Sequence, residues 1–195
     1  MSLTSVATRN PFERTSQLVT QRLRGMEDQV FVQLNGNNSF EQVGQPTDVW
    51  TTGELETALG RAPVLASDPA KGNKITDGGI EEAAVALTAE RQKVFITATR
   101  ESSGSAEFID NYGTAWDVKS PLSPPEGQNW KFSPDHQLTK VRHDLSQGDK
   151  VLFNLSRVND KDRDDTLQLL AQELTLNERG QIVILTDQEI VNTKY

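Results

Sequence analysis

The sequence predicts an α/β fold in which helices flank a mixed β-sheet. Three strand-like runs follow one another between residues 93 and 120, with a helical pattern before them and another after them. Two further apolar runs, residues 150–156 and 181–185, are separated by a helical pattern at 166–176. Consecutive strands joined by short turns favour antiparallel pairing, whereas strands separated by helices favour parallel pairing. We therefore expect one sheet that contains both kinds of pairing.

The region that begins at residue 76 gives the clearest signals. Its first helix is predicted over Ile80–Leu87, where apolar side chains recur at helical spacing. The next three strands are predicted, from β-branched content and short apolar runs, at residues 93–99, 106–110 and 114–120. The turn Asn111-Tyr112-Gly113 joins the last two strands and predicts an antiparallel hairpin.

The second half of this region begins with a loop. Pro121, Pro124 and Pro125 exclude regular structure up to about residue 132. A helix is predicted over 135–146, because Leu138, Val141 and Leu145 recur in helical register. The remaining elements are the strand at residues 150–156, the helix at 166–176 and the strand at 181–185.

Residues 1–75 give mixed signals. The patterns predict a helix at 12–26, a strand at 30–34, and a short capped helix at 52–60 that Gly60 closes. Residues 67–74 are polar and rich in helix breakers, which is typical of a linker or an exposed loop. The sequence thus predicts an N-terminal α+β region over residues 1–75 and a second domain over 76–195.

Composition limits the possible classes of protein. The chain has 195 residues, 35% hydrophobic and 25% charged, and no window approaches the roughly 18 apolar residues that a membrane span needs. Residues 1–9 lack the features of a secretory signal, so a cytoplasmic location is expected. Cysteine is absent, which excludes disulfides and thiolate metal sites. The net charge of −8 disfavours general binding to nucleic acid, unless one groove is locally basic.

An acid and an amine stand two residues apart on a predicted strand. Side chains alternate across a strand, so Asp117 and Lys119 are expected to share one face while Trp116 and Val118 face the core. Glu107 lies on the preceding strand of the hairpin. Two carboxylates and a lysine are a minimal set for holding a divalent cation and hydrolysing a phosphodiester. The alternative is an ordinary half-exposed strand whose acid and lysine face solvent.

The segment from Glu82 to Pro121 resembles a known family. It contains Glu82-Ala83-Ala84 on a helix, Ala106-Glu107-Phe108-Ile109, and Trp116-Asp117-Val118-Lys119-Ser120-Pro121. These motifs are similar to those of PD-(D/E)xK-superfamily nucleases, in particular the C-terminal nuclease domains of contact-dependent inhibition toxins and related polymorphic bacterial toxins. The chain departs from the family at Ala106-Glu107, where the family tends to have Pro-Asp.

The resemblance implies a restriction-endonuclease-like core of a helix, a three-strand meander, a helix and a fourth strand. It implies that Glu82, Glu107 and Asp117 hold Mg²⁺ or Mn²⁺, that Lys119 assists the attacking water, and that Gln147 contacts the substrate or a metal-bound water. The implied activity is metal-dependent cleavage of DNA or tRNA by residues 76–195, as a toxin or effector delivered into the cytoplasm of a target cell. An immunity protein is the implied partner, and residues 1–75 would serve delivery, docking or substrate contact. Glu82 has an alternative interpretation, as an acid favoured at a helix N-terminus.

Several basic residues follow the proline-rich loop. Lys131, Lys140, Arg142 and His143 are candidates for contact with a phosphate backbone, and Trp130 and Phe132 for stacking on a base. The second hypothesis for the whole chain is a non-catalytic, acidic α/β module that binds a protein partner, in which the acid and lysine of the hairpin are incidental.

Overall fold

The computed structural model describes residues 11–47, 49–191 and 193–195, so the predicted lack of a secretory signal at residues 1–9 falls outside the described residues. The helices, in chain order, are α1 (Pro11–Arg24), α2 (Thr52–Ala66), the 3₁₀ turn η1 (Pro69–Lys71), α3 (Asp77–Arg91), α4 (Pro134–Gln147), α5 (Asp160–Glu173), α6 (Leu176–Arg179) and the 3₁₀ turn η2 (Gln188–Ile190). The strands are β1 (Gln29–Leu34), β2 (Phe40–Gln42), β3 (Ser67–Asp68), β4 (Lys74–Ile75), β5 (Ala98–Arg100), β6 (Phe108–Asp110), β7 (Ala115–Lys119), β8 (Lys150–Asn154) and β9 (Ile182–Asp187).

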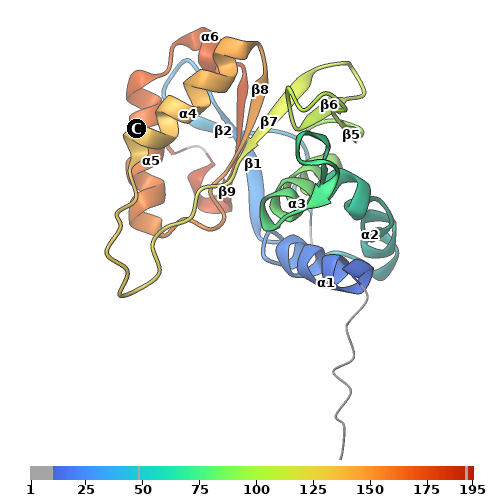
Figure 1. Cartoon of the computed structure of the whole chain (residues 1–195). Coiled ribbons are helices and arrows are strands. Elements are labelled where there is room, and N and C mark those ends of the chain that lie inside the picture. The colour runs from blue at the N-terminus through green and yellow to red at the C-terminus, as the bar shows by residue number, and fades with distance from the viewer. Residues whose placement is uncertain (1–10, 48, 192) are drawn as a thin grey trace, which may run out of the picture.

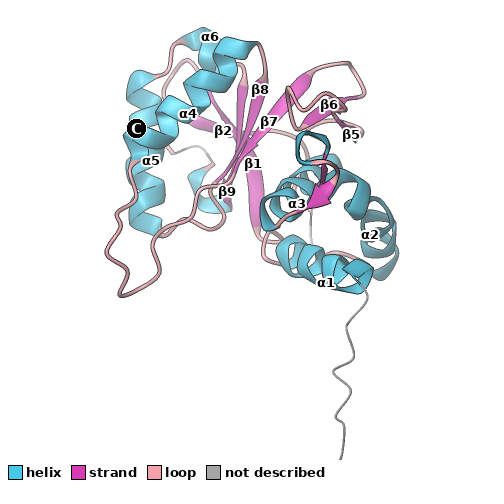
Figure 2. Cartoon of the chain, in the orientation of Figure 1, coloured by secondary structure: helices cyan, strands magenta, loops and turns pink. Residues whose placement is uncertain are grey.

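A seven-stranded sheet forms the centre of the molecule, in the order β2-β1-β9-β8-β7-β6-β5. Strands β7, β8 and β9 are parallel to one another, and the remaining pairs are antiparallel. Helices α1, α2 and α3 cover one face, and α4, α5 and α6 lie on the other (Figures 1 and 2). The prediction of an α/β fold with a mixed sheet between helices is confirmed.

Each face of the sheet has its own core. Phe31, Phe108 and Leu152 pack beneath α3, whereas Phe153 and Ile184 pack beneath α4 and α5. Alternation along each strand produces this division, because successive side chains point to opposite faces. A sheet buried on both faces explains why β8 and β9 read as continuous apolar runs.

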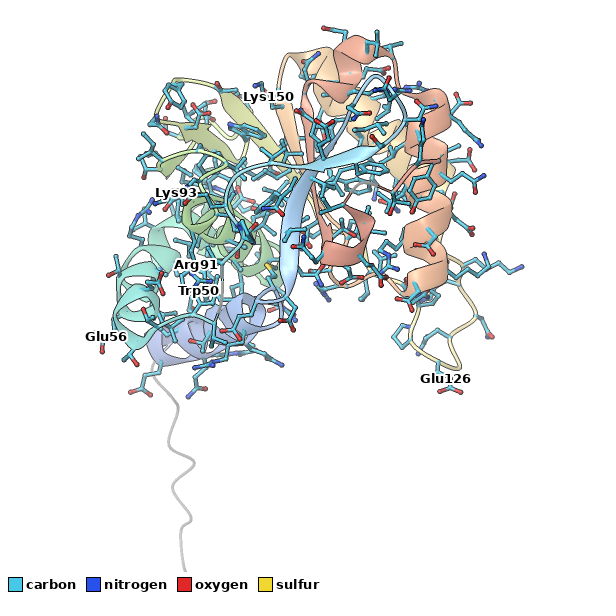
Figure 3. The ribbon with its side chains drawn as sticks, turned by 180° about the vertical axis from the view of Figure 1, so that it is seen from behind. Trp50, Glu56, Arg91, Lys93, Glu126 and Lys150 are labelled. Atoms are coloured by element: carbon cyan, nitrogen blue, oxygen red, sulfur yellow. The ribbon has the colours of Figure 1, made fainter. Side chains whose placement is uncertain are left out.

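Helix α3 lies directly against the sheet, with α1 and α2 packed on its outer side. Its small side chains permit this close approach: Ala83, Ala84 and Ala86 are fully buried. Gly79 is tighter still, because a Cβ built there would lie 2.3 Å from the carbonyl oxygen of Ala66 on α2. At the far end of α3, the Arg91 guanidinium lies 4.5 Å from the centroid of the Trp50 ring (Figure 3).

The N-terminal residues share the sheet and core of the rest of the chain. Strand β1 pairs with β9, and Val19 and Leu23 of α1 belong to the core beneath α3. Residues 67–74 are predicted to be a linker or an exposed loop. In the structure they form most of a small antiparallel hairpin, in which β3 pairs with β4. Within the described residues, no helix has both the length and the apolar character that crossing a membrane requires.

The predicted end of the helix at 52–60 is wrong. Its start is as expected, since Thr51 and Glu54 form a capping box. The helix does not stop at Gly60 but continues to Ala66 through Pro63. Burial of Ala62, Leu65 and Ala66 against neighbouring helices outweighs the cost of these helix breakers.

The strand predicted at 93–99 is also mostly wrong, because only Ala98 and the two residues after it pair with β6. Lys93 has φ +62°, the Val94 N–H donates to the carbonyl of Ala89 (2.9 Å), and the Lys93 N–H donates to that of Glu90 (3.0 Å). These are the two hydrogen bonds of a Schellman motif. The first residues of this β-branched run therefore end α3 instead of starting a strand. The helix predicted at 166–176 begins earlier than expected, at Asp160.

Candidate active site

The hairpin of β6 and β7 is built around Asp110. Its carboxylate accepts hydrogen bonds from the backbone N–H groups of Tyr112 (2.8 Å) and Thr114 (2.9 Å) and from the Trp116 indole (2.9 Å). Gly113 has φ +81°, a conformation that glycine adopts without strain. The hairpin predicted from the turn residues is confirmed, and it fixes how the two strands align.

Alternation along β7 separates its polar side chains from its apolar ones. Val118 packs in the core beneath α3, so Asp117 and Lys119 point to the opposite face. Their partners on β8, Val151 and Phe153, belong to the core beneath α4. Asp117 and Lys119 therefore lie between the sheet and α4.

Glu107, which immediately precedes β6, reaches the same face. Its N–H donates to the carbonyl of Trp116 (3.1 Å), which holds it beside β7. Its Oε2 accepts a hydrogen bond from the Val118 N–H (3.1 Å), and its carboxyl group is in hydrogen-bond contact with Asp117. The hairpin thus brings Glu107, Asp117 and Lys119 together.

Two aspartates from outside the hairpin complete this cluster. Asp144, on the buried face of α4, forms an ion pair with Lys119, in which its Oδ2 lies 2.8 Å from Lys119 Nζ. Asp149, which precedes β8, is in hydrogen-bond contact with Asp117. Lys119 Nζ lies 3.8 Å from Asp117 Oδ1. We call these five residues, Glu107, Asp117, Lys119, Asp144 and Asp149, the carboxylate cluster.

Burial and like charge perturb the cluster strongly. Burial, followed by the hydrogen bond with Asp117 and its charge, raises the pKa of Glu107 to about 9. Burial and Asp117 likewise raise the pKa of Asp149 to about 6. Burial lowers the pKa of Lys119, but Asp144 and the other carboxyl groups outweigh burial, so this pKa is raised and the amine stays charged. At neutral pH, Glu107 therefore holds a proton next to the Asp117 carboxylate.

The carboxylates of the cluster are oxygen donors, the kind of ligand that Mg²⁺ takes in proteins. Mg²⁺ usually takes one or two protein carboxylates together with water and substrate oxygens. Glu107 and Asp117 are two such groups in contact, and the proton on Glu107 offsets negative charge that a divalent cation would offset instead. Among the described residues, no set of three or more acidic or histidine side chains is arranged to hold one ion.

Glu82 of α3 lies near enough to the cluster for its charge to add to the raised pKa of Glu107. Glu82 pairs with Arg100 of β5 (2.8 Å). Glu81 is the buried acid of α3, with 3% of its surface exposed. Its Oε2 forms an ion pair with Arg22 Nε (2.9 Å) and accepts a hydrogen bond from Arg157 Nη1 (3.0 Å), and its Oε1 accepts from Asn154 Nδ2 (3.0 Å).

The other predicted residues divide into two groups. Gln147 is exposed at the end of α4 and donates to Ser146 Oγ (3.2 Å). Arg142 of α4 points toward α6, and its Nε donates a hydrogen bond to Glu178 of that helix (3.0 Å). His143, the next residue of α4, is exposed. Lys131 and Lys140, by contrast, line a pocket of about 450 Å³ together with Lys119.

Sequence reasoning missed Asp144, Asp149 and Glu81. Asp144 carried a usable signal, because it lies three residues after Val141 on the apolar face of a predicted helix, where an acid needs a partner. Asp149 follows Gly148 in the turn between α4 and β8 and carried no such signal. Glu81 differs from Glu82 only in the direction of its side chain around the helix.

Comparison of the chain with protein-family models, with curated proteins and with solved structures finds no match.

Proposed function

We propose that the chain is a metal-dependent nuclease that hydrolyses phosphodiester bonds of DNA or tRNA. The observation that supports this most directly is the meeting of Glu107, Asp117 and Lys119 on one face of the sheet. The order of α3, three antiparallel strands, α4 and the parallel strand β8 is the order that the resemblance to PD-(D/E)xK nucleases implies.

Each residue of the cluster has a role in this proposal. Glu107 and Asp117 would hold Mg²⁺ or Mn²⁺, which when bound polarises the scissile phosphate and acidifies a water. Lys119 carries a positive charge next to the two carboxylates, where it stabilises negative charge on the phosphate or orients the attacking water. Asp144 holds the Lys119 ammonium from the helix side (2.8 Å), so it acts as a positioning residue.

The biological setting is part of the same proposal and rests on the resemblance of residues 82–156. In that setting the chain is a toxin or effector that acts in the cytoplasm, and an immunity protein blocks it.

Cleavage assays test the activity. Purified protein is incubated with supercoiled plasmid and with total tRNA, with Mg²⁺, with Mn²⁺, or with a chelator. Asp117→Asn and Lys119→Ala are each expected to lower cleavage by about 100-fold or more, because each removes charge from the reacting centre. The matched controls are Asp165→Asn and Lys161→Ala, since this exposed ion pair of α5 lies outside the cluster.

Thermal melting of every variant separates loss of chemistry from loss of folding. Metal-dependent cleavage that both cluster variants lose, and both controls keep, supports the nuclease. If a folded wild-type sample cuts neither substrate with either metal, the nuclease proposal is wrong and the acidic protein-interaction module becomes the better hypothesis.

A further inference from the structure

A pocket lies where the loop after β7 returns to the first turns of α4. Its volume is about 450 Å³, and Lys119 forms part of its wall. The loop extends well away from the body of the molecule, with Glu126 near its tip (Figures 1 and 3). The side of this loop that returns to α4, with Trp130 and Lys131, forms the opposite wall.

The pocket is positively charged in an acidic protein. The chain has 28 Asp and Glu against 20 Lys and Arg, yet the residues that line the pocket include no Asp or Glu. Lys119, Lys131, Lys140 and His136 all contribute to the lining. Lys131 and Lys140 are exposed, and neither has a carboxylate within 4.0 Å among the residues that the structure describes. Their charges are thus available to an anion.

A large aromatic ring lies beside these charges. Trp130 is 47% exposed, whereas Trp50 and Trp116 are buried at 7% and 4%. Phe132 and Leu122 add apolar surface to the same pocket. An exposed indole next to unpaired ammonium groups matches a ligand with a flat apolar ring and a negative charge. Nucleotides have both features.

The size and position of the pocket restrict the form of that nucleotide. A volume of about 450 Å³ is in the lower part of the range for small-molecule sites and is too small to enclose a base pair with both backbones. A base can lie flat on an aromatic ring only where it is unstacked and unpaired. Lys119 belongs to both the pocket and the carboxylate cluster, so the bound nucleotide lies next to the reacting phosphate.

We propose that this pocket binds one unpaired nucleotide, with its base on Trp130 and its phosphate between Lys131 and Lys140, and that the substrate is therefore single-stranded or looped nucleic acid. The second half of this statement rests on the proposed nuclease function. The first half does not, because nucleotide binding needs neither metal nor catalysis.

Binding is measured first, in chelator, by quenching of tryptophan fluorescence with AMP and UMP, and by calorimetry for every variant. Trp130→Ala is expected to weaken binding by about 5- to 150-fold, the range found for one stacked base. Lys131→Ala and Lys140→Ala are expected to weaken it and to reduce its dependence on salt. The matched controls are Tyr112→Ala and Lys161→Ala, which remove an exposed aromatic ring and an exposed amine elsewhere. Inorganic phosphate is expected to bind more weakly than either nucleotide.

The pocket assignment is overturned if the wild type does not bind AMP or UMP at millimolar concentration, if the pocket variants behave like the controls, or if inorganic phosphate binds as well as the nucleotides. Cleavage then tests the substrate class, with an end-labelled hairpin that has a six-nucleotide loop and a fully paired duplex containing the same sequence. Cuts confined to the loop support the proposal, and equal cutting of the duplex overturns it.

The two proposals fail in different ways. Nucleotide binding without cleavage of any substrate contradicts the nuclease and leaves the pocket in place. Cleavage that survives Trp130→Ala unchanged, without measurable nucleotide binding, contradicts the pocket and leaves the nuclease in place.

Discussion

The protonated state of Glu107 has a consequence for stability that Glu107→Gln isolates. Glutamine keeps the shape of the side chain, with a carbonyl to accept from the Val118 N–H and an amide to donate to Asp117. The substitution removes only the ionisable proton of this side chain, so residue 107 no longer changes its charge with pH. Metal-free wild type is therefore expected to lose stability, relative to this variant, as the pH rises.

The sign and size follow from the two pKa values of Glu107. In the unfolded chain Glu107 titrates near its ordinary value of 4.5, and in the folded protein its pKa is about 9. Between these pH values the unfolded chain has released the proton, whereas the folded protein still holds it. The contribution of Glu107 to the free energy of unfolding is therefore fully present below pH 4.5 and decreases up to about pH 9. The slope is about 1.4 kcal/mol per pH unit, or nearly 3 kcal/mol between pH 6.5 and 8.5. Asp149, with its pKa near 6, has mostly titrated below this window.

Urea denaturation in chelator measures this effect, at four pH values from 6.5 to 8.5, with the fluorescence of the buried tryptophans as the signal. The matched control is Glu101→Gln. Hydrogen bonds from Ser103 lower the pKa of Glu101 to about 2, so this group is ionised in both states throughout the window. Glu101→Gln is thus expected to differ from wild type by an amount independent of pH. A difference between wild type and Glu107→Gln that also stays constant with pH would refute the proton on Glu107.

Three further predictions concern the cluster and the core. Asp117→Asn is expected to raise the melting temperature in chelator, since it relieves repulsion with Asp149, and to abolish the gain in melting temperature that Mg²⁺ is expected to give wild type; stabilisation of the variant by Mg²⁺ equal to that of wild type would exclude Asp117 as a ligand. Glu81→Ala leaves Arg22 and Arg157 without their shared carboxylate and is expected to lower the free energy of unfolding, measured by urea denaturation, by about 3 kcal/mol. Its control, Glu56→Ala, removes a side chain that points into solvent (Figure 3) and is expected to lower that free energy by less than about 0.5 kcal/mol. Gly79→Ala places a methyl group 2.3 Å from Ala66 O and is expected to cost about 3 kcal/mol, whereas Gly78→Ala, with no atom closer than 3.7 Å, is expected to be neutral or slightly stabilising; equal effects would show that α2 and α3 are not packed this tightly.

Local patterns predicted the hairpin well, because its determinants are close in sequence. Asp110 and Gly113 lie within the turn, and the alternation of Trp116, Asp117 and Val118 follows from extended backbone alone. The faces that Asp117 and Lys119 occupy were thus accessible from the sequence.

Contacts between distant segments decided the features that local patterns missed. Helix α2 passes Gly60 because residues beyond it are buried against other helices. Asp144 joins Lys119 only because α4 packs on β7 and β8, a contact between residues 25 positions apart in the chain. The placement of β1 beside β9 depends on pairing across more than 150 residues, which periodicity does not encode.

This placement of β1 decides how the molecule can be divided in the laboratory. A fragment that starts at residue 76 would lack β1, and β9 would then present unpaired N–H and C=O groups over Ile184–Asp187. The same cut would remove α1 and α2 and expose the alanine-rich side of α3. Such a fragment would be prone to edge-to-edge association, so inactivity of a 76–195 fragment would not test the roles proposed for the residues of the carboxylate cluster.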